Sequence, residues 1–395
     1  MRVGDLCEQV RGVSYDKRDA SPTPLPGYLP VLRANNITDN GLVFDDLVFV
    51  PARRVSARQR LKRHDIVVAA SSGSIDVVGK AAPALEDFEG GFGAFCKVLR
   101  PNTNVHPGYF AHFFKTRRYR QRVSALAAGA NINNLRNEHL DDFEIPFPPL
   151  AEQRRIAAIL DQAEAVRGQR RQALAKVAAL THFLFLDLFG DSAANPKRWP
   201  LRRVGELASK FSDGPFGSNL KSSHYTPTGV RVVRLQNIGV GEFLGEDAAF
   251  ISEGHFADLA RHECVPGDVL VGTLGDPNLR ACVLPPTILR ALNKADCVQI
   301  RANQDVATAA YICALLNMPS TAAKAHGLIL GQTRSRISMG RLRQLEVPVP
   351  PIELQHRFTE GTAAVERLKV AQRASLTKLD ALFASLQHRA FRGEL

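Results

Sequence analysis

Short apolar runs and long proline-free segments alternate twice along the chain. The runs at 66–69, 230–235 and 269–271 are separated by Gly, Pro and Asn, which is typical of strands joined by turns. A proline-rich hinge follows each group of runs, at 145–150 (IPFPPL) and at 347–352 (VPVPPI). Beyond each hinge the chain is rich in Ala, Leu, Gln, Arg and Glu, a composition that favours helix. The pattern predicts an α+β fold with two mixed domains in tandem, each followed by a long helix.

The two expected helices carry apolar residues at alternating steps of three and four, which is the spacing of a coiled-coil seam. The predicted seam positions are Ile156, Ile159, Val166, Val177, Leu180 and Leu184 in the first helix, and Phe358, Val365, Leu368, Leu379, Leu382 and Leu386 in the second. Arg170 and Gln372 place one polar residue near the middle of each seam, where it can fix the register. These midpoints would meet in either direction of pairing. A whole domain lies between the helices in sequence, and this favours an antiparallel coiled coil.

The second half of the chain repeats the first with a period of about 202 residues. The repeated segments are RVGDL at 2–6 and RVGEL at 203–207, VLRANNI at 31–37 and VVRLQNI at 232–238, and Gln153 with Gln355. Their order and spacing are kept, so we expect an internal pseudo-two-fold repeat. We assign 1–145 to the first mixed domain, 146–190 to the first hinge and helix, 191–347 to the second mixed domain, and 348–395 to the second hinge and helix.

Composition and charge narrow the choice of partner. The 395 residues include 51 Lys and Arg against 39 Asp and Glu, and the resulting net charge of +12 favours a polyanion such as nucleic acid. A merely basic soluble protein is the alternative. Six scattered cysteines without a CxxC pair argue against a disulfide framework or zinc site and fit a reducing cytosol. No run approaches the ~18 consecutive apolar residues of a membrane span. We therefore expect a cytoplasmic protein with no membrane partner.

Catalytic motifs are weak throughout the sequence. The NPPF- or DPPY-type motif of adenine methyltransferases does not occur, and residues 276–279 (DPNL) resemble it only superficially. The string at 73–80 departs from a phosphate-binding P-loop in its spacing, and Ala81 stands where Ser or Thr is required. We expect this chain to have no enzyme activity, no cofactor and no metal of its own.

Polar loops led by glycine precede both hinges at equivalent places in the repeat. Asn pairs well with adenine edges and Arg with guanine edges, so equivalent loops of different chemistry suit two different DNA half-sites. The candidate DNA-binding residues of these loops are Asn131, Asn133, Asn134 and Arg136 in the first half, and Gln332, Thr333, Arg334 and Arg336 in the second. The alternative is that the loops are polar turns that satisfy their own backbone.

Two other groups could contact DNA phosphates. In both halves an apolar strand is followed by small residues, which permit close backbone approach, and then by a cation. An arginine cluster follows the aromatic segment 109–114 and is predicted to share one helix with it. The candidates are Ser71, Ser72, Ser74 and Lys80, then Thr273, Asn278 and Arg280, and lastly Arg117, Arg118 and Arg120. Plain turns and a solvated helix face are the alternatives. The motif at 33–36 recurs at 234–237, and being common to both halves it suits fold or backbone contact better than specific reading.

Several segments together resemble the specificity subunit of type I restriction–modification systems. They are LRANNIT at 32–38, IPFPPLAEQRRIAAIL at 145–160, FGD at 189–191, NPKRWP at 195–200, DGPFGSNLKSSHY at 213–225, VPVPPIELQ at 347–355 and FRGEL at 391–395. The second hinge reads PIELQ where the first reads PLAEQ, and the first half lacks the Trp199-Pro200 lead-in of the second. The resemblance covers nearly the whole chain, and the hinge before a long helix is its most specific part.

The resemblance implies two target recognition domains, each reading one half of a bipartite, asymmetric site in double-stranded DNA. It also implies that the helices set the half-site spacing and dock two methyltransferase subunits, which bind S-adenosylmethionine. Restriction subunits with translocase and nuclease activity would complete this host-defence complex, in which the present chain is non-catalytic. Two alternatives remain. One is a specificity subunit for a combined methyltransferase–nuclease, and the other is a coiled-coil scaffold with two protein-binding domains.

Overall fold

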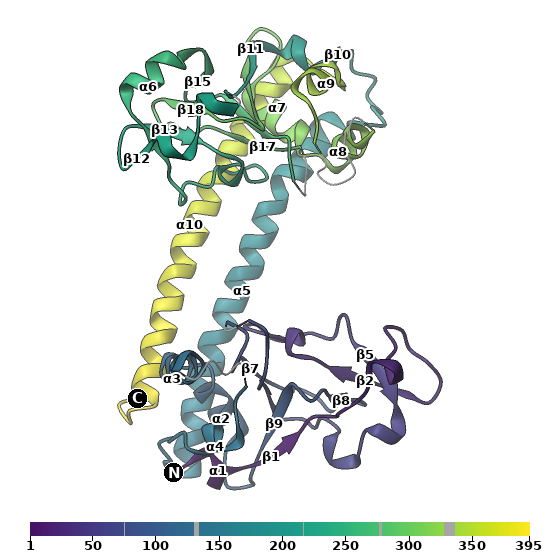
Figure 1. Ribbon diagram of the computed structural model, residues 1–395, viewed down its shortest axis with the longest axis vertical. Coiled ribbons are helices and arrows are strands. Elements are labelled where there is room, and N and C mark those ends of the chain that lie inside the picture. Colours follow the sequence, from purple (N-terminus) through teal and green to yellow (C-terminus); the bar gives the residue numbers. More distant parts are fainter. Residues whose placement is uncertain (75, 130–133, 216, 276–278, 328–335) are drawn as a thin grey trace. The chain divides into compact units, whose positions relative to one another are not determined.

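The computed structural model describes residues 1–74, 76–129, 134–215, 217–275, 279–327 and 336–395 (Figure 1). The chain divides into two compact units. Unit 1 comprises Met1–Arg171 and Ala374–Leu395, and unit 2 comprises Gln172–Arg373. Two long helices, α5 (Leu150–Phe189) and α10 (Ile352–Ala390), each contribute one part to each unit. Each begins directly after a hinge proline, because proline has no N–H to lose there and its ring cannot be accommodated further inside a helix.

A four-stranded antiparallel sheet in the order β1-β9-β6-β7 forms the centre of unit 1. Its strands are β1 (Cys7–Arg11), β9 (Cys96–Pro101), β6 (Ile66–Ala69) and β7 (Ala81–Pro83). The unit also has a three-stranded sheet, β5 (Val48–Pro51), β2 (Tyr28–Leu32) and β8 (Gly91–Phe92), and the pair β3 (Ile37–Thr38) and β4 (Gly41–Leu42). All four residues of β6 are buried, which explains its continuous apolar run.

The helices of unit 1 depart from the sequence prediction at the arginine cluster. Besides its part of α5 and of α10, unit 1 contains α1 (Val3–Leu6), α2 (Pro107–Phe113), α3 (Arg117–Gly129) and α4 (Asn137–Asp141). The aromatic residues lie on α2 and the arginines on α3, so the expected single helix is wrong. Thr116 separates the two: its hydroxyl donates to the Phe113 carbonyl at 2.7 Å and accepts from the Tyr119 amide at 3.2 Å. Such a cap starts a new helix.

Unit 2 repeats the central sheet of unit 1 with the strand order β11-β19-β16-β17. These strands are β11 (Ala208–Asp213), β19 (Cys297–Ala302), β16 (Val269–Gly272) and β17 (Arg280–Val283). A five-stranded sheet contains β12 (Tyr225–Thr226), β14 (Phe250–Ile251), β13 (Val230–Val233), β18 (Ala291–Asn293) and β15 (Glu263–Cys264), and β10 (Leu201–Arg203) pairs with β20 (Glu346–Pro348). The shorter helices of unit 2 are α6 (Glu253–Asp258), α7 (Ala309–Leu316), α8 (Pro319–His326) and α9 (Met339–Gln344).

Within each unit, the contacts between α5 and α10 show that the two helix segments run in opposite directions. In unit 1, Arg167 of α5 is paired with Asp380 of α10 at 2.6 Å, and Arg155 donates to the carbonyl of Leu395. In unit 2, the rings of Phe189 and Phe358 lie 5.3 Å apart. Leu184 fills the space beside Gly361, where an added Cβ would lie 2.5 Å from the leucine methyl carbon. This contact accounts for the glycine at position 361 of α10.

Burial corrects four of the twelve predicted seam residues. Val166, Leu180, Leu368 and Leu382 are 40–53% exposed, whereas the other eight are buried or partly buried. In unit 1, α10 buries Phe383, one residue beyond the exposed Leu382. Its ring lies 4.2 Å below the Arg167 guanidinium, so a cation–π contact and the aromatic core together select this face.

The aromatic cores join the sheets to the long helices inside each unit. In unit 1, Tyr109 and Phe113 of α2 pack against Phe391, with ring centroids 5.0 and 5.6 Å away. In unit 2, Tyr311 of α7 packs against Phe185 and Phe189 of α5 at 5.7 and 5.0 Å. Each mixed domain is therefore built onto the helix ends through a buried aromatic cluster.

Length and composition also make α5 the one helix, among the residues described, that could cross a membrane. The core helices of soluble proteins have the same length and apolar composition. This finding differs from the sequence expectation, which counted only uninterrupted apolar runs.

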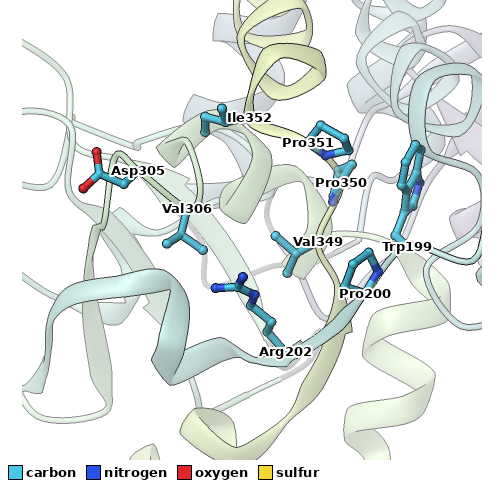
Figure 2. Close-up of a pocket in the computed structure, with 9 residues that line it drawn as sticks. All are labelled: Trp199, Pro200, Arg202, Asp305, Val306, Val349, Pro350, Pro351 and Ile352. Carbon is cyan, nitrogen blue, oxygen red and sulfur yellow. The ribbon is translucent and has the colours of Figure 1, made fainter.

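The second hinge of the chain, at 347–352, lies in unit 2 and borders a cavity of about 350 Å³ (Figure 2). Trp199 and Pro200 flank it together with the hinge residues Pro350 and Pro351. The indole nitrogen of Trp199 donates to the Phe189 carbonyl at 3.0 Å, so the segment that leads into β10 is fastened to the last turn of α5.

Candidate nucleic-acid interface

Three loops meet at one end of the central sheet in unit 1. They are the segment after β6, the turn before β9 and the segment before α4. The Phe95 carbonyl accepts hydrogen bonds from the amides of Ala70 and Ser71 at 2.9 and 3.0 Å. The Leu135 amide donates to the Ala70 carbonyl at 2.7 Å, and Ser71 forms a β-bridge with Asn134. We call this meeting of Ser71, Phe95 and Asn134 loop junction 1.

Unit 2 contains the corresponding arrangement, loop junction 2, formed by Leu274, Asp296 and Arg336. Leu274 forms a β-bridge with Arg336, and the Ile337 amide donates to the Thr273 carbonyl at 3.0 Å. The Asp296 carbonyl accepts from the Thr273 amide at 3.1 Å and from its hydroxyl at 3.0 Å. Two loop groups that sequence reasoning treated separately thus lie together in each unit.

The two junctions differ in chemistry although their backbones correspond. Junction 1 presents the small neutral side chains of Ser71 and Asn134 beside the exposed ring of Phe95. In junction 2 the Arg336 guanidinium lies 3.2 Å from the Asp296 carboxylate. Thr273 is buried, and its hydroxyl is held by the Asp296 carbonyl.

The remaining candidates in these loops lie at or near the surface, or outside the described part of the chain. Ser72 is half-buried and accepts from the amide of Ser74, which is exposed, at 3.2 Å. Arg136 is exposed two residues beyond Asn134, at the start of α4. The candidates that fall outside the described residues are Asn131, Asn133, Asn278, Gln332, Thr333 and Arg334.

The cations that follow the small residues have different surroundings. Lys80 is paired with the exposed carboxylate of Asp39 at 3.2 Å. Arg280 donates to the carbonyls of Ile238, Leu274 and Leu235 at 2.7, 3.2 and 3.1 Å. Because Leu274 belongs to junction 2, Arg280 holds that loop through its backbone.

The arginines of α3 divide between solvent and the fold. Arg117 and Arg118 are exposed. Arg120 donates to the carbonyls of Val78 and Asp76 at 3.0 and 3.2 Å, and so supports the segment that follows Ser74. Arg120 therefore stabilises the backbone of this segment, whereas Arg117 and Arg118 are exposed to solvent.

The motif shared by both halves has a structural role in each. The Arg33 guanidinium donates to the Asp46 carbonyl at 2.7 Å, and Asn35 donates to its carboxylate at 3.2 Å. Arg234 and Gln236 hold Asp247 in the same way, at 2.5 and 2.7 Å. The Gln236 bond, followed by that from Arg234, lowers the pKa of Asp247. These contacts agree with the expectation that a common motif serves the fold.

Sequence reasoning missed two buried aspartate–arginine pairs, each at the end of a central sheet opposite to the loop junction. Asp65 is 1% exposed, and both its oxygens accept from Arg100 at 2.8 Å. Asp268 is likewise buried and is bound by Arg301 at 2.8 and 2.9 Å. The hydrogen bonds to Asp65 and Asp268 are the main cause of the raised pKa of Arg100 and Arg301, respectively. The matching places of both pairs in the repeat were the available signal.

No group of three or more His, Cys, Asp or Glu able to hold a metal ion is found among the described residues. All six cysteines are buried and free. Burial raises the pKa of Cys7 and Cys96 to about 12, which keeps both thiols protonated and unreactive.

Comparisons with known proteins identify relatives of the whole chain. The type I restriction modification DNA specificity domain matches residues 1–176. The chain is 30% identical to the type I restriction enzyme EcoKI specificity subunit of Escherichia coli (strain K12), over 100% of this chain and 88% of that protein. It is 49% identical to the StySPI specificity subunit of Salmonella potsdam over 159 residues, which are 40% of this chain and 34% of the relative.

Two solved structures share the fold. One is a chain from a study of complex assembly and conformational transition of the type I R-M system, with a TM-score of 0.60 and 19% identity over 100% of this chain and 97% of that chain. The other is the S subunit of the type I restriction–modification system from M. genitalium, with a TM-score of 0.51 and 16% identity over 99% and 95%.

Proposed function

Because the chain belongs to the specificity subunits of type I restriction enzymes and supplies DNA sequence specificity, we propose that each unit reads one half of a bipartite target. The observation that carries this proposal is the pair of loop junctions. They occupy equivalent places in the repeat and present different side chains, as two readers of different half-sites require. The target is therefore asymmetric.

Base recognition is assigned to the exposed Asn134 of junction 1 and to the partly exposed Arg336 of junction 2. Asn134 has the amide that pairs with an adenine edge, and Arg336 has the guanidinium that pairs with guanine. Phosphate contacts are assigned to the exposed Arg117, Arg118 and Arg136, and to Lys80 once it exchanges Asp39 for a phosphate. The net charge of +12 supports a salt-dependent component of affinity.

The long helices are proposed to form an antiparallel coiled coil that separates the two recognition domains. The opposite direction of the α5 and α10 contacts inside each unit supports this arrangement. Helix length would then set the distance between half-sites, since each helical residue adds about 1.5 Å. Half-sites read from one face of B-DNA lie about one turn, ~34–36 Å, apart.

The chain is proposed to act without catalysis of its own, inside a cytoplasmic complex. Two methyltransferase subunits would bind S-adenosylmethionine and modify adenine, and restriction subunits would complete the enzyme. A combined methyltransferase–nuclease partner is the second candidate, because the chain's features suit either system. A scaffold with two protein-binding domains is disfavoured, since neither the net charge nor the paired loops would then have a role.

The test is methylome sequencing of a strain that carries this gene with its methyltransferase gene, beside a strain in which this gene is deleted. One bipartite adenine-methylated motif should disappear on deletion. Replacement of residues 1–145 by the corresponding domain of a relative should then change one half of that motif and leave the other half intact. If the methyltransferase is expressed and bound to this chain, and no motif changes on deletion, the function proposed here is wrong.

A further inference from the structure

Phe95 is an exposed aromatic residue on the turn between β8 and β9. The Cys96 amide donates to the Gly93 carbonyl at 2.8 Å and closes the turn, with Ala94 and Phe95 at its corner. The Phe95 side chain is 68% exposed. A single exposed apolar residue is ordinary in itself, but the position of Phe95 next to two polar loop residues is not.

The backbone of Phe95 is fixed at the centre of loop junction 1. Its carbonyl accepts from both Ala70 and Ser71, and Ser71 is bridged in turn to Asn134. Ala70 and Ser71 directly follow the buried strand β6. The backbone of Phe95 is therefore attached to the end of the central sheet. The fold thus exposes a phenyl ring to water beside Ser71, a candidate for DNA contact, and Asn134, which is assigned to base recognition.

The equivalent turn in unit 2 carries a different residue at the same point. The Cys297 amide donates to the Lys294 carbonyl at 3.1 Å, and Ala295 and Asp296 occupy the corner. The Asp296 carbonyl accepts from Thr273, as that of Phe95 accepts from Ala70 and Ser71. Its carboxylate pairs with Arg336. The carbonyl of the corner residue therefore has the same role in both turns. The presented side chain differs, and Asp296 has a positive φ of 67°, which Phe95 does not.

We propose that Phe95 is a specificity-determining residue that packs its ring against the bases of the half-site read by unit 1. Two chemistries suit an exposed phenyl ring next to polar readers: contact with a thymine methyl group, or insertion at a flexible base step. Both remove the ring from water, which is the driving force for this contact. This inference rests on the proposed DNA-reading function and names one residue of that site.

The test uses the full chain in complex with its methyltransferase subunits and a duplex that carries the complex's own methylated motif. The variants are Phe95→Ala, Phe95→Trp and the control Leu85→Ala. Leu85 is 76% exposed in the same unit. It lies at the opposite end of β6 from Ser71, because the preceding residue Ala84 donates to the Asp65 carbonyl at the start of that strand.

Phe95→Ala should weaken binding to the motif duplex about 10-fold or more, the range for loss of an aromatic contact with a base. Phe95→Trp should retain most of the affinity, and Leu85→Ala should match the wild type. The dependence of log affinity on log salt should be unchanged in Phe95→Ala, because no phosphate contact is lost. A 2-aminopurine placed at successive positions of the half-site should brighten on wild-type binding if the ring is inserted, and stay dim if it contacts a methyl group.

Two results would overturn the inference. One is equal affinity of Phe95→Ala and Leu85→Ala for the motif duplex. The other is loss of methyltransferase subunits from Phe95→Ala in size-exclusion chromatography, which would make Phe95 a protein contact. The failure of the proposed function itself has a different signature, since the wild-type complex would then not distinguish the motif duplex from an unrelated duplex.

Discussion

The side-chain oxygen of Gln153 accepts a hydrogen bond from the main-chain amide of His106 at 2.9 Å. Its amide nitrogen donates to the Pro148 carbonyl at 2.9 Å, so this fully buried side chain joins the hinge to the start of α2. Gln355 repeats the arrangement in unit 2 with the Thr308 amide and the Pro350 carbonyl, both at 2.9 Å. The recurrence of glutamine beside each hinge thus has a physical cause: proline-rich segments make few backbone hydrogen bonds and need side chains to fix them.

Gln153→Ala is expected to destabilise unit 1 by about 2–4 kcal/mol, because two partly buried backbone groups lose their partner. The measurement is urea unfolding combined with hydrogen exchange. The variant should increase exchange in α2 and leave α7 unchanged, whereas Gln355→Ala should do the reverse. Gln162→Ala, at an exposed site on α5, is the control. Equal stability of Gln153→Ala and Gln162→Ala would show that the clamp contributes nothing.

The buried pair Asp65–Arg100 gives a second prediction. Asp65→Asn should cost about 3–5 kcal/mol, because the Arg100 guanidinium would remain largely buried without its counter-charge. Combining it with Arg100→Leu should cost less than the two single changes added together, since the unpaired charge is removed. Urea midpoints of the four proteins measure this coupling. Glu152→Gln, which breaks the exposed pair with Arg155, should leave the urea midpoint close to that of the wild type. Additive losses at Asp65 and Arg100 would contradict the prediction.

Much of the fold could be predicted because the sequence contains two copies of the same pattern. The strands β6 and β16, the hinges and the starts of α5 and α10 recur with one period, so each half supports the assignment of the other. The resemblance to specificity subunits is confirmed by relatives that span the chain. The candidate loops were found for the same reason, since they occupy matching places next to each hinge.

The rest depended on contacts between residues distant in sequence. Nothing local indicates that Ser71 lies against Asn134, because the pairing of β6 with β9 and the position of α4 bring them together. The partner of a cation could not be predicted from the sequence either. Arg280 donates to three carbonyls, whereas Lys80 pairs with one carboxylate. On the helices, a seam drawn at steps of three and four missed the shift from Leu382 to Phe383, which cation–π packing selects.

His262 predicts a pH dependence of unit 2. Its Nε2 accepts from Arg261 at 2.9 Å, and its Nδ1 donates to the Asp213 carbonyl at 2.6 Å. Burial is the first cause that lowers the pKa of His262, and the Arg261 charge adds to it. The unfolded chain therefore binds more protons than the native state just below pH 6.5, so the free energy of unfolding falls as pH decreases through that value. His262→Gln should flatten this slope between about pH 7 and 5.5 in urea unfolding. An unchanged slope in the variant would assign the effect to other groups.

Arg336 and Asn134 offer a matched test of half-site reading. Arg336→Ala should relax the motif at one position of the half-site read by unit 2, since a bidentate pair with guanine discriminates by about 1–3 kcal/mol. Asn134→Ala should relax the other half-site and leave the first intact. Asp296→Asn keeps the side-chain shape while removing the charge that pairs with Arg336, so it should preserve the motif and strengthen binding at low salt. Methylome sequencing of strains that carry each variant reads all three outcomes. If both alanine variants methylate an unchanged motif, the junctions bind no bases; if both relax the same half-site, the assignment of one half-site to each unit is wrong.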